Sequence, residues 1–307
     1  PDTVTSIGSY AFRNCTSMSS ITIPDGVVTI GNGAFQNDTA ATVVTFGRSV
    51  ETIGDDAFNN CSKLPKIIFS EGIKSIGHRA FRECTSLTEV YLPSTLTYIS
   101  HWTDGDATFY NCRNIQKITV PQYIVSSDRA ATDMFAWSRD KIKTIAFSGT
   151  ITYIGPRAFD GFTALENVSD STVLIPDTVT SIGSYAFRNC TLVSSIKIPD
   201  SVVNIGNSAF QNNTNATILT FGKNTQVISD DAFNNCSKLP EVILSEGISS
   251  MFNYCRGKIK EIYLQDNVTS ITSNGLSGIS GATVYYKNNI PSGTPWGGSN
   301  ISVEKYE

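Results

Sequence analysis

The chain has 307 residues, of which 16% are charged, and its formal net charge at pH 7 is −4. A weakly negative chain without a basic stretch is a poor nucleic-acid binder, and no run approaches the ~20 apolar residues that a membrane helix needs. Ser, Thr and Asn are abundant, which is typical of an extracellular protein with a water-facing surface.

The first 23 residues contain a pattern that returns along almost the whole chain. Its most regular position is a phenylalanine, and random placement would not put so many in one column. A single period of this kind indicates a stack of coils rather than a globule with a pocket. The phenylalanines of this column are Phe12, Phe35, Phe58, Phe81, Phe109, Phe135, Phe159, Phe187, Phe210, Phe233 and Phe252.

Each unit closes on a short alternation of apolar residues, such as Ile21 with Ile23 and Val90 with Leu92. This period of two predicts a strand with one buried face. A Pro, Gly or Ser then ends the strand, and a Val/Ile pair and the Ala-Phe turn follow. A unit of this size cannot bury its own apolar edge, so it must stack on the next one.

The expected fold is mostly β, with short turns and 3-10 segments. Residues 1–288 would form one solenoid of about twelve coils of ~23 residues each, with a parallel β-sheet on the concave face. The period stops after residue 288, and residues 289–307 are expected to form a C-terminal cap with a last strand at 301–306. A cap of this kind would cover an otherwise open apolar edge.

The repeat, read as Pro-Asp-x-Val-x-x-Ile-Gly-x-x-Ala-Phe-x-x-Cys, resembles the BspA-type (treponemal-type) leucine-rich repeat family over residues 1–288. The resemblance implies a leucine-rich-repeat solenoid. It also implies a secreted or surface protein of host-associated bacteria or trichomonad protists, with a role in adhesion for several members.

A longer period is superimposed on the short one. Residues 1–16 recur without change at 176–191, which indicates that a block was duplicated, residues 1–72 corresponding to 176–247. Insertions interrupt the short period near 100–108, 122–134 and 169–173. Near-identical copies favour a scaffold or a repeated binding surface, because a unique active site would not need duplicating.

Seven cysteines follow the phenylalanines by three residues: Cys15, Cys61, Cys84, Cys112, Cys190, Cys236 and Cys255. Asp38, Ser138, Phe162 and Asn213 take the same place in other coils, so thiol chemistry is not required there. Buried free thiols that serve the turn are therefore favoured over disulfides between adjacent coils, since the count is also odd.

The two adjacent enlarged coils carry Trp102, Asp104, Asp106, Arg129 and Trp137. If these residues lie side by side, they could contact a sugar or a protein, because Trp offers a large area at low entropic cost. The alternative, which is favoured, is that each Trp fills a gap left by a degenerate coil. Asp104 and Asp106 could also hold Ca²⁺, although the ligand series is short.

The outward row of the predicted sheet has two tyrosines that each follow an isoleucine one coil earlier. Tyr91 follows Ile68, and Tyr263 follows Ile243. Tyr91 and Tyr263 are candidate docking residues for a protein partner, against the more ordinary interpretation that they fill the strand surface.

Nothing in the sequence predicts an enzyme. The two histidines, His78 and His101, belong to no metal-ligand spacing or nucleophile-base pair, and no glycine-rich phosphate loop is present. No cofactor or metal is expected. Hydrolysis at the Trp102–Asp106 bulge is kept as a minor hypothesis.

The function expected is a non-catalytic extracellular module that binds host or microbial proteins in adhesion. The alternative is a glycan-binding accessory module of a larger secreted protein. No nucleic acid partner and no direct membrane insertion are expected. The protein is expected to be secreted or on the cell surface, with its signal peptide and anchor outside this chain.

Overall fold

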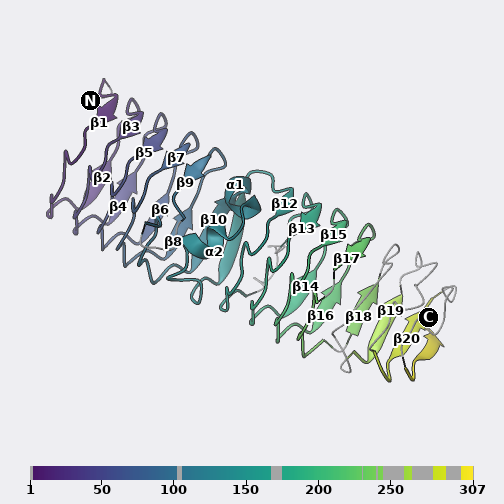
Figure 1. The fold of residues 1–307 in the computed structure, drawn as a ribbon. Coiled ribbons are helices and arrows are strands. Elements are labelled where there is room, and N and C mark those ends of the chain that lie inside the picture. Colours follow the sequence, from purple (N-terminus) through teal and green to yellow (C-terminus); the bar gives the residue numbers. More distant parts are fainter. Residues whose placement is uncertain are drawn as a thin grey trace. The chain divides into compact units, whose positions relative to one another are not determined.

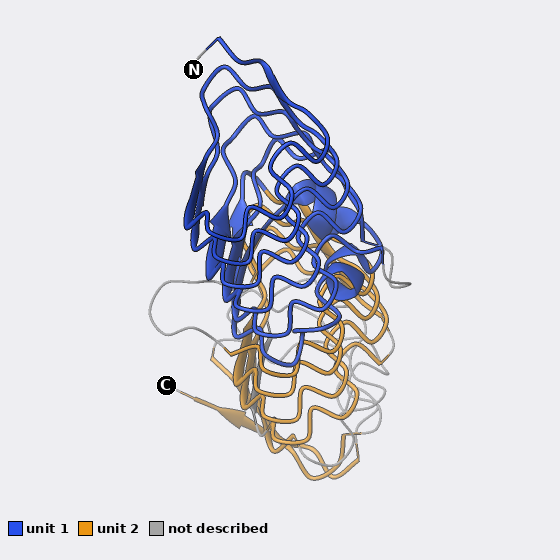
Figure 2. Cartoon of the chain, turned by 90° about the vertical axis from the view of Figure 1, so that its left-hand side faces the viewer, with its two compact units in different colours: residues 1–150 blue, residues 151–307 orange. Residues whose placement is uncertain are grey.

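The computed structural model describes residues 3–101, 106–166, 175–229, 231–239, 241–244, 259–264, 279–287 and 299–306. The fold is a mostly-β solenoid of parallel strands with about 11 turns, close to the twelve expected. The chain divides into two compact units, residues 1–150 and 151–307 (Figure 2). Each unit is described by itself below.

Unit 1 contains the predicted strands of the apolar alternation. They are β2 (Ser20–Thr22), β4 (Val43–Thr45), β6 (Lys66–Ile68), β8 (Glu89–Tyr91), β10 (Lys117–Pro121) and β11 (Thr144–Ser148). β2 pairs with β4, and β6, β8, β10 and β11 form a four-stranded parallel sheet. Equivalent residues of successive coils are paired, so that Ile67 lies opposite Val90 and Val90 opposite Ile118. These central side chains are buried.

A second, narrower parallel sheet was not predicted. Its strands are β1 (Ser6–Ile7), β3 (Thr29–Ile30), β5 (Thr52–Ile53), β7 (Ser75–Ile76) and β9 (Tyr98–Ile99). Each strand has two residues, too few to show an alternation in the sequence. The two kinds of strand form separate rows in unit 1 (Figure 1). From β1 to β10, strands of the two kinds alternate along the chain, and between β10 and β11 two helices stand in place of a two-residue strand.

Unit 2 repeats the arrangement. Its narrow sheet consists of β12 (Tyr153–Ile154), β13 (Ser181–Ile182), β15 (Asn204–Ile205) and β17 (Val227–Ile228). Its wide sheet consists of β14 (Ser195–Lys197), β16 (Ile218–Thr220), β18 (Glu241–Leu244), β19 (Glu261–Leu264), β20 (Thr283–Tyr286) and β21 (Ser302–Lys305). β21 is the strand expected within 301–306, and it pairs in parallel with β20. The insertion near 169–173 and most of the expected cap lie outside the described residues.

The phenylalanine column is a stack of rings in the interior of each unit. Phe35, Phe58 and Phe81 stack with centroids 5.1 Å apart and nearly parallel planes. In unit 2 the Phe187–Phe210 and Phe210–Phe233 spacings are 5.3 Å and 5.2 Å. Such pairs add stability beyond the burial of their area. Phe252 lies outside the described residues.

The enlarged segment 122–134 contains two short helices, α1 (Gln122–Ser126) and α2 (Ala130–Met134). An enlargement was predicted here but helices were not. Ile124 and Val125 of α1 and Met134 of α2 are buried, so packing holds these helices in place. Neither has a side-chain cap, the usual start signal for a helix.

The turn around each phenylalanine requires left-handed backbone. The residue two positions after the Phe has a positive φ in most coils, and it is usually asparagine, as at Asn37 (66°) and Asn60 (62°). Asparagine tolerates this conformation better than most residues. The side chains also form a ladder, since Nδ2 of Asn37 donates to Asn14 and Nδ2 of Asn60 donates to Asn37.

The cysteine column serves the backbone of the preceding coil. The thiols of Cys61, Cys84 and Cys112 donate to the carbonyls of Phe35, Phe58 and Phe81 at 3.5, 3.3 and 3.0 Å. The six cysteines within the described residues are free thiols, and Cys255 lies outside them. Each of these carbonyls already accepts a backbone N–H within its own turn, so the thiol adds a second hydrogen bond that links it to the next coil.

Candidate functional site

The wide sheet of unit 1 presents a small apolar patch to solvent. Ile68 on β6 pairs directly with Tyr91 on β8, and the two residues are 55% and 39% exposed. Directly opposed side chains on one sheet face are close enough to act as one surface. The sequence predicted this neighbourhood, and the strand register places the two residues together.

A row of alternating charge borders this pair. Lys66, Glu89 and Lys117 are exposed, and they lie opposite one another on β6, β8 and β10. Opposite charges on neighbouring strands attract, so the side chains of this row are held beside one another. Ile68, Tyr91, Lys66, Glu89 and Lys117 are called the sheet patch below.

The outward row does not continue evenly beyond Tyr91. Thr119, its neighbour on β10, is only 6% exposed, and this exposed row therefore ends at Tyr91. α1 follows β10 directly and packs against it. The outward row of unit 1 is therefore exposed at β6 and β8 and covered at β10.

In unit 2, Tyr263 lies in a comparable position. Ile243 of β18 pairs with Tyr263 of β19, which pairs with Tyr285 of β20. The Tyr263 and Tyr285 rings stack at 4.8 Å, and the Tyr263 hydroxyl donates to Glu261. The tyrosine is therefore held in a fixed orientation by its own sheet.

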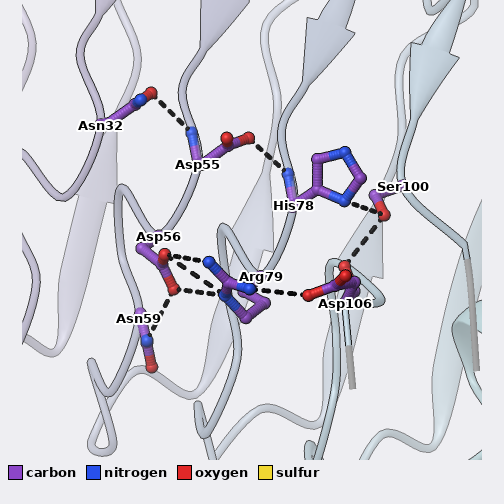
Figure 3. A network of polar contacts seen from close by, with 8 residues as sticks. All are labelled: Asn32, Asp55, Asp56, Asn59, His78, Arg79, Ser100 and Asp106. Carbon is purple, nitrogen blue, oxygen red and sulfur yellow. Dashed lines mark hydrogen bonds and ion pairs between the residues drawn. The ribbon is translucent and has the colours of Figure 1, made fainter. Parts of the chain in front are cut away.

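The acidic bulge of the first enlarged coil is only partly described. Trp102 and Asp104 lie outside the described residues. The carboxylate of Asp106 accepts a hydrogen bond from Arg79 at 2.6 Å (Figure 3). This carboxylate thus holds two coils together. Any role for Asp106 in ion or ligand binding would have to compete with Arg79.

Arg79 is the centre of a clamp between coils. It donates to Asp56 on one side and to Asp106 on the other (Figure 3). The hydrogen bonds to Asp56, followed by the charge of that carboxylate and the contacts with Asp106, raise the pKa of Arg79 above its ordinary value. Asn59 donates to Asp56 at 2.9 Å and completes the cluster.

The structure brings His78 next to Ser100, which sequence spacing did not reveal. Nδ1 of His78 lies 3.1 Å from Oγ of Ser100, and Figure 3 shows the two side chains pointing toward one another. A histidine beside a serine is the geometry of a nucleophile with its base. The hydrogen bonds around the pair decide whether it can act in that way.

The Ser100 hydroxyl is committed elsewhere. It donates its single proton to the carbonyl of Asp106 at 2.9 Å, so Nδ1 of His78 must be the donor to Oγ. Nε2 of the neutral ring then accepts from the Tyr98 hydroxyl, 3.2 Å away. Ser100 is also buried. A base would have to accept the serine proton, and here the ring nitrogen donates, so the pair is built as a structural contact.

The second enlarged coil places Arg129 and Trp137 in separate surroundings. Arg129 has a left-handed φ of 60° and pairs with Asp133 at 3.1 Å. Trp137 packs its ring against Tyr110 and lies under the guanidinium of Arg113. Within the described residues, no recorded contact joins Asp106, Arg129 and Trp137 into one site.

In the described part of the chain, no group of three or more His, Cys, Asp or Glu residues could hold a metal ion. In the same residues, no helix has the length and apolar character that spanning a bilayer demands.

The repeat was compared with known proteins. A family model described as the BspA-type leucine-rich repeat region matches in six copies, over residues 1–103, 103–172 and 164–283. The chain belongs to the BspA-type leucine-rich repeat family. A search of curated proteins gave no match.

Several solved structures are similar in fold. A leucine-rich repeat protein from Bacteroides ovatus is 20% identical, with 98% of this chain and 78% of that one covered and a TM-score of 0.46. The pneumococcal vaccine antigen PcpA is 17% identical, with coverages of 99% and 85% and a TM-score of 0.46. A leucine-rich cell surface protein from Faecalibacterium prausnitzii is 23% identical, with coverages of 93% and 84% and a TM-score of 0.37.

Proposed function

We propose that this BspA-type repeat protein is a non-catalytic module of the cell surface or the secreted fraction, and that it binds extracellular proteins through the sheet patch. The observation that carries the proposal is the exposed Ile68–Tyr91 pair, directly opposed on neighbouring strands and bordered by Lys66, Glu89 and Lys117. An aromatic and an aliphatic side chain beside a charged border have the make-up of an interface centre and its rim.

A non-catalytic role is supported by the hydrogen bonds of the His78–Ser100 pair, which resembles a base and a nucleophile within the described residues. Ser100 is buried and gives its proton to a backbone carbonyl, and His78 donates to it. Asp106, the described carboxylate of the acidic bulge, is bonded to Arg79. Binding by a repeated surface requires neither group to react.

The test is binding to a panel of purified extracellular-matrix proteins, measured by surface plasmon resonance. If the sheet patch binds, Tyr91→Ala and Ile68→Thr should each weaken the interaction about tenfold or more, as expected of residues at an interface centre. Thr22→Ala is the matched control, because Thr22 is exposed on β2 at the same strand position. The control should bind as the wild type does.

Tyr263→Ala tests the second Ile-Tyr pair in the same assay. A further loss in the double variant Tyr91→Ala/Tyr263→Ala would mean that both units contribute to capture. The proposal fails if the wild type binds no protein of the panel, or if Tyr91→Ala and Ile68→Thr bind as tightly as Thr22→Ala.

A further inference from the structure

A cluster of aromatic and cationic side chains lies away from the sheet patch, next to the phenylalanine turns of unit 1. The guanidinium of Arg82 lies 5.1 Å from the centre of the Tyr110 ring, and that of Arg113 lies 4.9 Å from the Trp137 ring. Tyr110 and Trp137 pack edge to face at 5.1 Å. The four side chains therefore form one continuous group over three coils, and it is called the edge cluster below.

Arg113 is the most available group of this cluster. It is exposed, its flat guanidinium is held over the indole ring, and its Nε donates to Oδ1 of Asn111. Among the described residues, no carboxylate forms an ion pair with it. Its terminal nitrogens therefore remain as donors on a group that is already oriented, and a planar fork of this kind matches an oxyanion.

The remaining charges of the cluster do not cancel Arg113. Arg82 has Glu83 beside it at 3.7 Å, and Glu83 also accepts a hydrogen bond from Nδ2 of Asn111. Two guanidiniums therefore stand against one carboxylate, which leaves a net positive charge on an otherwise weakly acidic protein.

A related cluster in unit 2 contains an arginine whose charge is neutralised by a carboxylate. Tyr185 has Arg157 and Arg188 over its ring. Arg188 makes two hydrogen bonds to the buried Asp160, at 2.9 and 2.5 Å. Here the ring-stacked arginine serves an ion pair within the fold, whereas Arg113 in unit 1 has no such partner among the described residues.

We infer that the edge cluster is a binding site for an acidic saccharide. The carboxylate or sulfate of the sugar would bind the terminal nitrogens of Arg113, and a pyranose ring would lie on the exposed part of Trp137. Trp137 is 38% exposed, so a large rigid ring is available next to the cation. The site is distinct from the sheet patch and does not depend on the proposed protein binding.

Saccharide is favoured over nucleic acid by the charge and by the ring. A nucleic-acid groove needs a line of basic residues to neutralise successive phosphates, and this site offers one unpaired guanidinium on a chain of net charge −4. One oriented arginine beside one exposed indole suits a ligand that combines a single oxyanion with the apolar C–H face of a sugar ring.

The test uses oligogalacturonide, whose uronic acids carry carboxylates, and the same oligosaccharide with its carboxylates methyl-esterified. Titration calorimetry of the full chain should give binding of the free acid that is about tenfold or more tighter than that of the ester, since a charge-assisted hydrogen bond is lost. Heparin oligosaccharide serves as the sulfate arm, and Arg113-dependent binding of heparin that is lost when its sulfates are removed assigns the oxyanion as sulfate.

Three variants separate the contributions of charge and ring. Arg113→Gln should lower the affinity for the free acid to that for the ester. Trp137→Ala should weaken both forms while the preference for the acid remains. Arg48→Gln is the charge-matched control, because Arg48 is exposed and already paired with Asp25, and it should bind as the wild type does. Thermal melts confirm that the variants are folded.

The inference is overturned by several outcomes. The first is that the wild type binds neither anionic saccharide. The second is that it binds the free acid and the ester with equal affinity and shows no Arg113-dependent binding of heparin. The third is that the Arg113→Gln variant binds as tightly as the wild type. An equal loss in Arg48→Gln would also overturn it, because the attraction would then come from the general charge of the surface. None of these outcomes bears on Tyr91 or Ile68, so the protein-binding proposal stands or falls separately.

Discussion

Asp38 occupies a place in the interior column where most coils have cysteine. Its side chain is buried, and its Oδ1 accepts the backbone N–H of Cys15 at 2.7 Å. Its Oδ2 has no hydrogen-bond partner. Burial raises the pKa of Asp38 from 3.8 to about 6. At the same place in the duplicated block, Asn213 donates from Nδ2 to the carbonyls of Phe187 and Phe210.

Asp38→Asn should therefore stabilise unit 1 above pH 6. Because the folded pKa of Asp38 lies above its unfolded value, the contribution of Asp38 to stability is fully present below about pH 4 and is lost as the pH rises through about 6. At pH 8 the variant should be more stable by up to about 3 kcal/mol, and near pH 4 the gain from removing the charge should vanish. Urea unfolding at the two pH values measures both quantities.

The reverse exchange in unit 2 is the control for this prediction. Asn213→Asp should bring the same pH dependence to unit 2, because the new carboxylate would face the same carbonyls without the amide proton. An Asp38→Asn variant whose stability shows the same pH profile as the wild type would contradict the assignment.

The column of interior residues was predictable from the sequence, but its chemistry was only partly so. Substitution by Asp38 and Asn213 indicated that thiol reactivity is not needed, and the thiols indeed act as donors to carbonyls. The left-handed backbone could not be predicted in every coil. Asn60 suggests it, but Arg79 and Tyr185 have positive φ values as well, and their residue types give no such signal.

At the scale of the element, close stacking of coils depends on a glycine after the isoleucine of the narrow strand. A Cβ on Gly54 would lie 2.8 Å from the backbone nitrogen of Asn32 and 2.9 Å from the carbonyl carbon of Gly31. Atoms this close must separate, and the neighbour is backbone, so it cannot move alone. The sequence showed that glycine recurs here, and the structure supplies the reason.

Gly54→Ala should consequently destabilise unit 1 by about 1–3 kcal/mol, the usual cost of overpacking. Gly8→Ala is the matched control in the first coil, where a Cβ would have nothing within 4 Å, and its cost should be smaller. Thermal unfolding of both variants provides the comparison. Equal losses would show that the approach of neighbouring coils is not the cause.

Strand prediction succeeded where the pattern was long enough and failed where it was not. The wide sheet follows from alternation at residues such as Val90 and Leu92. The narrow sheet has strands of two residues, and the segment 122–134 has helices of five. Elements this short carry no period of their own, because neighbouring coils and buried contacts define them rather than local preference.

At the scale of the molecule, the solenoid distributes its stability over neighbouring coils. Phe58 stacks on Phe35 and Phe81 at 5.1 Å on either side, and it also meets Phe46 edge to face. In an array of this kind, each repeat contributes its own stability and that of its contacts with the next. The destabilisation caused by substituting one interior residue should therefore be confined to the neighbouring coils.

Phe58→Ala should cost about 3–5 kcal/mol, the range for removing a buried phenylalanine. Hydrogen exchange in the native protein should accelerate in the coils from Phe35 to Phe81 while unit 2 keeps its protection. Phe12→Ala is the control, because Phe12 is 41% exposed and has a described ring neighbour on one side only, and its effect should be smaller. Uniform acceleration over both units would contradict local coupling.

The candidate sites were less predictable than the fold. The Ile68–Tyr91 pair follows from the period, because equivalent positions of adjacent strands must meet. The Arg113–Trp137 contact and the His78–Ser100 contact join residues of coils with unequal length. A fixed repeat spacing therefore does not predict them. Side chains at irregular coils are positioned by packing, which a repeat pattern alone does not describe.

The buried thiols can report when neighbouring coils of the solenoid separate. Burial raises the pKa of Cys61 and of Cys190 well above the ordinary value, so alkylating reagents would find no thiolate in the closed state. Alkylation of these thiols would then require adjacent coils to separate. Peptide mapping of the alkylated cysteines over time would show in which order the coils open. Cys15, which is only half-buried, would be labelled first and would mark the start of the time course.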